Sequence, residues 1–206
     1  KDIPAVEAAL CEPLSCSAYA VNQTGMGMED TVVISGLGAI GMGMLQFALL
    51  RNPKRVIGID TNDALCEIAK KLGAAEVLNP MKEDVTKRIM ELTDGVGCDI
   101  YMEATGNPAS VETGMNCLRK QGMLFIYSVF KKKAEIDLNQ ISEFKELRVI
   151  GGHLSPGAFP YTIDCLEKGK INAKVMVTDI FALNEIDEAM SAKKPDRVSI
   201  KTVLVP

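Results

Sequence analysis

The chain has 206 residues, 47% hydrophobic and 24% charged, enough for one sizeable core or for one core plus a small appendage. Its net charge of −4 comes without a basic block, which argues against a nucleic-acid partner. No apolar run reaches transmembrane length and no signal peptide is recognisable, so we expect no membrane association. Six scattered cysteines without a C-x-x-C pair indicate reduced thiols and a cytoplasmic location. Because Lys1 is not an initiator methionine, we expect a piece of a longer protein.

The chain opens with a helical pattern over residues 4–22, in which Pro13 is expected to break or kink the helix. A loop over 22–30 leads to alternating strand and helix patterns. The strand patterns lie at 31–34, 56–59, 76–78, 99–102, 123–127 and 147–150. The helical patterns lie at 39–50, 61–72, 81–92, from after Gly106 through Leu118, at 139–146 and at 159–167.

This alternation predicts an α/β fold, a doubly wound six-stranded parallel sheet of the Rossmann type with helices on both faces and strand order 3-2-1-4-5-6. The end of the chain is surplus to that sheet, since it reads as a strand over 175–183, a helix over 184–191 and a strand over 198–205. We therefore divide the chain into a helical lead-in, a dinucleotide-binding domain and a C-terminal tail, with boundaries at 1–29, 30–172 and 173–206.

Three glycines follow the first predicted strand with the spacing G-x-G-x-x-G: Gly36, Gly38 and Gly41. The first permits a tight turn, the second leaves bare backbone on which a pyrophosphate can lie, and the third lets the next helix pack close to the sheet. The N-terminus of that helix offers unpaired N–H groups and a positive dipole end to the phosphates. The simpler alternative is a tight strand–helix turn that holds no ligand.

Asp60 ends the second predicted strand, nineteen residues after Gly41, near the spacing expected for the acid that holds the ribose hydroxyls of a dinucleotide. Its carboxylate would repel a 2′-phosphate, and Thr61, Asn62 and Asp63 supply no cation to receive one. The pattern therefore predicts NAD rather than NADP. Asp60 could also be the N-cap of the next helix, which would not exclude binding.

The ligand crevice of a doubly wound sheet lies at the carboxyl ends of its strands, where strands 1 and 4 diverge. The glycine segment 36–41, Asp60, Thr105 and Ser128 all fall at such ends. Their convergence points to the same site independently of the glycine motif.

Five stretches in order give the chain a wider resemblance: AALCEPLS at 8–15, VISGLGAIG at 33–41, AKKLGA at 69–74, EATG at 103–106 and KTVLVP at 201–206. Together they resemble zinc-dependent medium-chain alcohol and polyol dehydrogenases, especially the sorbitol, threitol and threonine dehydrogenase branch. The resemblance implies an NAD-dependent oxidoreductase of secondary alcohols or polyols. With the motif, it assigns coenzyme binding to Gly36, Leu37, Gly38, Ala39, Ile40, Gly41, Asp60, Thr61, Thr105, Tyr127, Ser128, Val129, Gly152, His153 and Leu154, the last six at the nicotinamide end.

The resemblance covers only the coenzyme-binding half of such enzymes. Their N-terminal catalytic domain holds zinc through one of its cysteines and a Gly-His-Glu motif, and this sequence contains neither that domain nor that motif. Glu12 matches a Glu-Pro that faces the zinc in polyol dehydrogenases, so it is the one metal contact expected here, and only together with the missing domain. The lead-in and the tail resemble the segments that join that domain. We expect the fragment to bind NADH without oxidising an alcohol.

The expected substrate is a small alcohol or polyol, and the expected assembly is a homo-oligomer, a dimer or tetramer, formed through the coenzyme-binding domain. Two other classes fit parts of the pattern. A non-catalytic NAD-binding module would carry the same motif, and an S-adenosylmethionine methyltransferase also has glycines after its first strand and an acid after its second. The two residues before Gly41 and the stretch Glu103–Gly106 argue against the methyltransferase.

Overall fold

The computed structural model describes residues 3–191 and 198–206 of the chain. Its centre is a six-stranded parallel sheet in the order β3-β2-β1-β4-β5-β6, which confirms the predicted topology. The strands are β1 (Thr31–Ser35), β2 (Arg55–Ile59), β3 (Glu76–Leu78), β4 (Cys98–Glu103), β5 (Leu118–Ile126) and β6 (Arg148–Gly151). The strand β1 pairs with both β2 and β4. From β1 the chain therefore moves along the sheet in one direction to β3 and then returns to build β4, β5 and β6 in the other direction. A crevice opens at the carboxyl ends of β1 and β4, where the two halves of the sheet meet.

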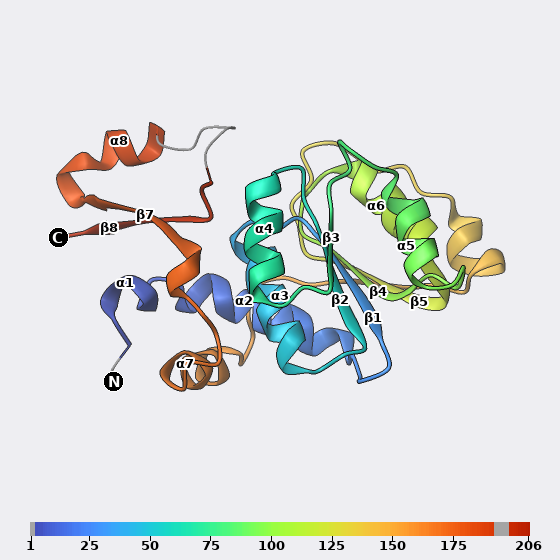
Figure 1. Cartoon of the computed structure of the whole chain (residues 1–206), viewed down its shortest axis with the longest axis horizontal. Coiled ribbons are helices and arrows are strands. Elements are labelled where there is room, and N and C mark those ends of the chain that lie inside the picture. Colours follow the sequence, from blue (N-terminus) through green and yellow to red (C-terminus); the bar gives the residue numbers. More distant parts are fainter. Residues whose placement is uncertain (1–2, 192–197) are drawn as a thin grey trace.

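Helices cover both faces of this sheet (Figure 1). One face carries α2 (Cys11–Thr24), α3 (Ala39–Leu50) and α4 (Asp63–Leu72), with α7 (Phe159–Glu167) packed against α2. The other carries α5 (Val85–Leu92) and α6 (Pro108–Cys117). Successive strand residues point to opposite layers, so Val32 and Ile34 belong to the first core and Val33 to the second.

The C-terminal tail forms a separate two-stranded parallel sheet, β7 (Val177–Ala182) and β8 (Lys201–Val205), with α8 (Ile186–Ser191) beside it (Figure 1). Short 3₁₀ turns precede β7 and α8, at Lys174–Met176 and Leu183–Glu185. The tail is therefore surplus to the main sheet, as predicted, although β8 begins later than the pattern indicates. Residues 1–2 of the lead-in and 192–197 of the tail lie outside the described residues. Within the described ranges, no helix combines the length and apolar character needed to cross a bilayer.

The prediction that Pro13 breaks the first helix is wrong. The helix α2 continues through Pro13 to Thr24, and the break lies earlier, between α2 and α1 (Ala5–Ala8). Pro13 lies in the first turn of α2, where a backbone N–H has no intrahelical partner to lose.

Two helices begin later than their periodicity predicts because a side chain caps each of them. Asn62 accepts a hydrogen bond from the N–H of Ala64, so α4 begins after it. Asp84 accepts one from Lys87, so α5 is shorter than the predicted 81–92. The predicted helix over 139–146 is a π-helical turn at Gln140–Phe144.

The fifth strand is longer than predicted because α6 passes directly into β5 at Leu118. The ammonium of Lys145 donates hydrogen bonds to the carbonyls of Met115, Asn116 and Leu118, at 2.7, 2.9 and 2.8 Å. The ammonium group thus provides hydrogen-bond donors for the carbonyls at the C-terminus of α6. The helix can therefore end without a glycine-containing turn.

Candidate functional site

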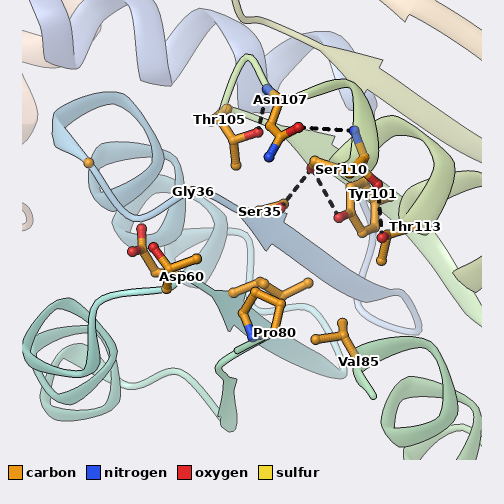
Figure 2. A pocket seen from close by; sticks show the side chains of 15 residues that line it. Ser35, Gly36, Asp60, Pro80, Val85, Tyr101, Thr105, Asn107, Ser110 and Thr113 are labelled. Atoms are coloured by element: carbon orange, nitrogen blue, oxygen red, sulfur yellow. Dashed lines mark hydrogen bonds between the residues drawn. The ribbon is translucent and has the colours of Figure 1, made fainter. Parts of the chain in front are cut away.

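A cavity of about 450 Å³ opens at the carboxyl ends of the central strands (Figure 2). Five of the residues predicted from the sequence line it: Gly36, Gly38, Asp60, Thr61 and Thr105. They come from the segments that follow β1, β2 and β4, so the topology brings together residues that are far apart in the chain.

Two of the three motif glycines are required by the fold itself. Gly36 has a φ of +93°, and a Cβ there would lie 2.8 Å from the carbonyl oxygen of Ala104. A Cβ on Gly41 would lie only 1.7 Å from the carbonyl oxygen of Gly36. These glycines therefore close the turn between β1 and α3, as either reading of the motif requires.

Gly38 is different, because nothing in the fold requires a glycine at this position. Its φ is −67°, which any residue can adopt, and a Cβ there would find no described atom within 4 Å. The residue is exposed at the N-terminus of α3, and no described side chain caps that terminus. The first-turn N–H groups and the bare backbone of Gly38 thus face open space that suits an anionic ligand.

The carboxylate of Asp60 is tied to the glycine turn. One of its oxygens accepts a hydrogen bond from the N–H of Leu37 at 2.7 Å, and the other accepts one from Asn62 at 2.9 Å. Figure 2 shows this carboxylate at the end of the cavity where the Gly36 turn lies. Asp60 is not the N-cap of α4, since Asn62 has that role. The carboxylate is half-buried and keeps acceptor capacity beyond these two bonds.

The buried side chain of Glu103 fixes the position of Thr105. Glu103 is fully buried, and its Oε1 accepts hydrogen bonds from the N–H groups of Thr105 and Gly106, at 2.7 and 3.1 Å, and from the Thr105 hydroxyl. A Cβ on Gly106 would lie 2.7 Å from the carbonyl oxygen of Val129. The loop after β4 therefore lies directly against the loop after β5.

The sequence interpretation missed a cluster of hydroxyl groups in the cavity wall. The Tyr101 hydroxyl lies 3.2 Å from Ser110 Oγ, and Ser110 donates to Ser35 Oγ at 2.9 Å (Figure 2). Burial raises the pKa of Tyr101, so its hydroxyl stays protonated near neutral pH. Ser35 could have been found because it directly follows the strand pattern at 31–34, but Ser110, in the first turn of α6, carries no such signal. Tyr101 could not have been found either, since its ring fits only because Gly114 of α6 has no Cβ, which would lie 2.6 Å from it.

The remaining predicted residues do not line this cavity. Leu37 has a buried side chain in the core, and Ala39, Ile40 and Gly41 lie in the first turn of α3. The other six lie at the ends of β5 and β6: Tyr127, Ser128, Val129, Gly152, His153 and Leu154. They form a second region, connected to the first through the contact of Gly106 with Val129.

The described residues do not complete a metal site around Glu12, the one metal contact predicted from the sequence. Glu12 is exposed on α2, and its Oε1 accepts a hydrogen bond from Cys16 Sγ at 3.4 Å. Over 3–191 and 198–206, no three His, Cys, Asp or Glu side chains come together in a group that could hold a metal ion. Since zinc takes about four protein or water ligands, these residues do not by themselves form a zinc site.

Comparison with known proteins gives a consistent result. A family model described as zinc-binding dehydrogenase matches residues 39–168. The erythritol/L-threitol dehydrogenase of Mycolicibacterium smegmatis is 40% identical over 205 residues, which is 100% of this chain and 57% of the relative. A sorbitol dehydrogenase of Halalkalibacterium halodurans is 30% identical over 97% of this chain and 58% of its own length. The chain thus spans somewhat more than half of these relatives.

Solved structures agree with the fold. The 2R,3R-butanediol dehydrogenase of Bacillus subtilis superimposes with a TM-score of 0.90 at 27% identity, over 100% of this chain and 59% of that one. A Sinorhizobium meliloti protein, described as a zinc-binding dehydrogenase bound to NADP, gives a TM-score of 0.90 at 27% identity. It is matched over 99% of this chain and 61% of its own.

Proposed function

Because the chain belongs to the zinc-binding dehydrogenase family, we propose that its cavity binds the adenosine half of NAD. The observation that carries this proposal is Gly38, a glycine that the fold does not need and that leaves open space at the N-terminus of a helix. The pyrophosphate would lie on this bare backbone and accept hydrogen bonds from the first turn of α3. The adenosine ribose would donate its hydroxyls to Asp60.

The nicotinamide half would then extend past Gly38 toward the ends of β5 and β6. This direction is supported by the order of the sheet, because a dinucleotide crosses the crevice from one half of a doubly wound sheet to the other. The second region of predicted residues, at 127–129 and 152–154, lies on that path. We propose that its backbone receives the nicotinamide.

The preference for NAD over NADP rests on the Asp60 carboxylate. It would face a 2′-phosphate with a like charge, and the nearby cation Lys82 is already paired with Asp63 at 2.6 Å. A relative of similar fold is bound to NADP, so this preference is a property to measure in this chain and not one to transfer from relatives.

For the whole protein we propose oxidation of a secondary alcohol or polyol. This proposal is supported by the relatives, which are named as dehydrogenases of erythritol, threitol and sorbitol. NAD supplies the hydride acceptor when it is bound. The residues described here bind and orient that coenzyme. Glu12 would approach a zinc ion held by residues outside this chain. Because the chain lacks those residues, we propose that it binds NADH without oxidising an alcohol.

Replacing Asp60 with alanine should weaken NADH binding about 10-fold to 100-fold, because two ribose hydroxyls lose a charged acceptor. The affinity for NADPH should change much less, so the dissociation constant of NADPH divided by that of NADH should fall. Fluorescence titration with both coenzymes measures that ratio. The variant also leaves two N–H groups without their acceptor, at a cost of about 1–3 kcal/mol, so its unfolding should be measured as well.

Glu67→Ala is the matched control, because it removes an exposed carboxylate of α4 outside the cavity lining and leaves the Lys82–Asp63 pair in place. It should leave the ratio of the NADH and NADPH dissociation constants unchanged. An Asp60→Ala variant that keeps the wild-type ratio would show that this carboxylate does not select the coenzyme.

We further propose a cytoplasmic homo-oligomer, a dimer or tetramer. The six cysteines are all free, which supports a reducing compartment. The strand β6 is one of the two outer strands of the main sheet, and its Val149 is 38% exposed, so a second copy could pair there. Sedimentation equilibrium should show a concentration-dependent dimer or larger species, and a monomer at high concentration would contradict this proposal.

A further inference from the structure

The ring of Tyr127, just after β5, lies against the bare backbone of Gly152. A Cβ on Gly152 would come within 2.7 Å of both the Tyr127 and the Phe125 ring. The two rings are stacked, with centroids 6.3 Å apart and an interplanar angle of 14°. The end of β5 thus holds the segment after β6 by a close contact that only glycine permits.

The hydroxyl of Tyr127 makes a second contact with the same segment, since it donates a hydrogen bond to the carbonyl oxygen of Leu154. Burial raises the pKa of Tyr127, so the hydroxyl remains a donor near neutral pH. Leu154 has a φ of +54°, a left-handed conformation that is unfavourable for a γ-branched side chain. Ser15 of α2 anchors the next residue by donating to Ser155 Oγ at 2.8 Å.

This unfavourable backbone has no evident role in the core. The Leu154 side chain is 57% exposed and His153 is also exposed, so hydrophobic burial does not account for the conformation. Strained backbone of this kind persists only where surrounding contacts fix it, and it concentrates at ligand sites. The segment lies at the carboxyl end of β6, on the same edge of the sheet as the crevice.

We infer that Tyr127 is a positioning residue, which holds the backbone of residues 152–154 in the shape that receives the nicotinamide half of the coenzyme. The inference rests on the proposed function, because it takes NAD as the ligand. It assigns different parts of the coenzyme to different residues. Gly38 and Asp60 bind the adenosine diphosphate half, and Tyr127 affects the binding of the nicotinamide half alone.

Tyr127→Phe tests this role, because it keeps the ring against Gly152 and removes the hydroxyl, which donates to Leu154 and also contacts Cys16. The probes are NADH and ADP-ribose, which share the adenosine diphosphate portion and differ in the nicotinamide. Titration should show NADH binding weakened about 5-fold to 10-fold, the usual effect of one lost hydrogen bond, with ADP-ribose binding unchanged within about 2-fold. A residue that only stabilises the fold would affect both ligands alike.

Tyr161→Phe is the matched control, since it removes a tyrosine hydroxyl on α7, and both dissociation constants should keep their wild-type values. Gly152→Ala is a second variant, which displaces the Tyr127 ring and should reproduce the selective loss of NADH affinity. Equal effects of Tyr127→Phe on the two ligands, or none, would overturn the inference. If wild type binds neither ligand, the proposed function itself fails, so the two failures are distinguishable.

Discussion

Replacing Gly38 with alanine should nearly abolish NADH binding while leaving the stability of the chain unchanged. The methyl group would stand where the pyrophosphate must approach the backbone, so we expect the dissociation constant to rise by about 100-fold or more. The fold should tolerate it, because the residue has an ordinary φ of −67° and its Cβ would meet no described atom within 4 Å. Fluorescence titration with NADH and urea unfolding measure the two quantities.

Gly27→Ala is the control for adding a methyl group. A Cβ there would have an ordinary contact of 3.9 Å with Asp30 Oδ2, and Gly27 lies outside the cavity lining. It should change neither affinity nor stability. A Gly38→Ala variant that binds NADH as wild type does would mean that the motif is only a strand–helix turn.

Gly41→Ala should have the opposite consequence, a loss of folding. Its Cβ would lie 1.7 Å from the carbonyl oxygen of Gly36, well inside any permitted contact, and both partners are backbone that cannot rotate away. We expect a loss of about 4 kcal/mol or more in the free energy of unfolding, a large part of the stability of a typical domain.

Urea unfolding followed by circular dichroism measures this loss, with Gly38→Ala as the comparison three residues away. Accumulation of Gly41→Ala in insoluble form would have the same meaning. A stability within about 1 kcal/mol of wild type would show that α3 can move away from the β1 turn. The opposite effects of two glycines in one motif separate the needs of the fold from those of the ligand.

The sequence predicts the sheet well because its signals are local. Runs of β-branched residues mark β1 and β2, and glycines at fixed spacing mark the turn into α3, so strand order and the location of the crevice follow from topology rules. Helix starts were less accurate, because the periodicity of α4 and α5 continues upstream of the caps Asn62 and Asp84.

The finer features of the site depend on contacts between segments that are distant in the chain. The spacing of the motif does not distinguish Gly38, which faces open space, from Gly41, which faces a carbonyl group. The hydroxyl of Tyr101 reaches Ser110 only because α6 presents Gly114 to its ring. Tyr127 was predicted to contribute backbone, and the structure adds a contact of its side chain with Leu154.

The central claim is that bare backbone at the start of α3 and the carboxylate of Asp60 together accommodate a nicotinamide dinucleotide. Calorimetric titration of the 206-residue chain with NADH, and separately with S-adenosylmethionine, tests it most directly. The account predicts saturable binding of one NADH per chain, with S-adenosylmethionine much weaker. Tighter binding of S-adenosylmethionine, or no saturable heat with NADH, would contradict it.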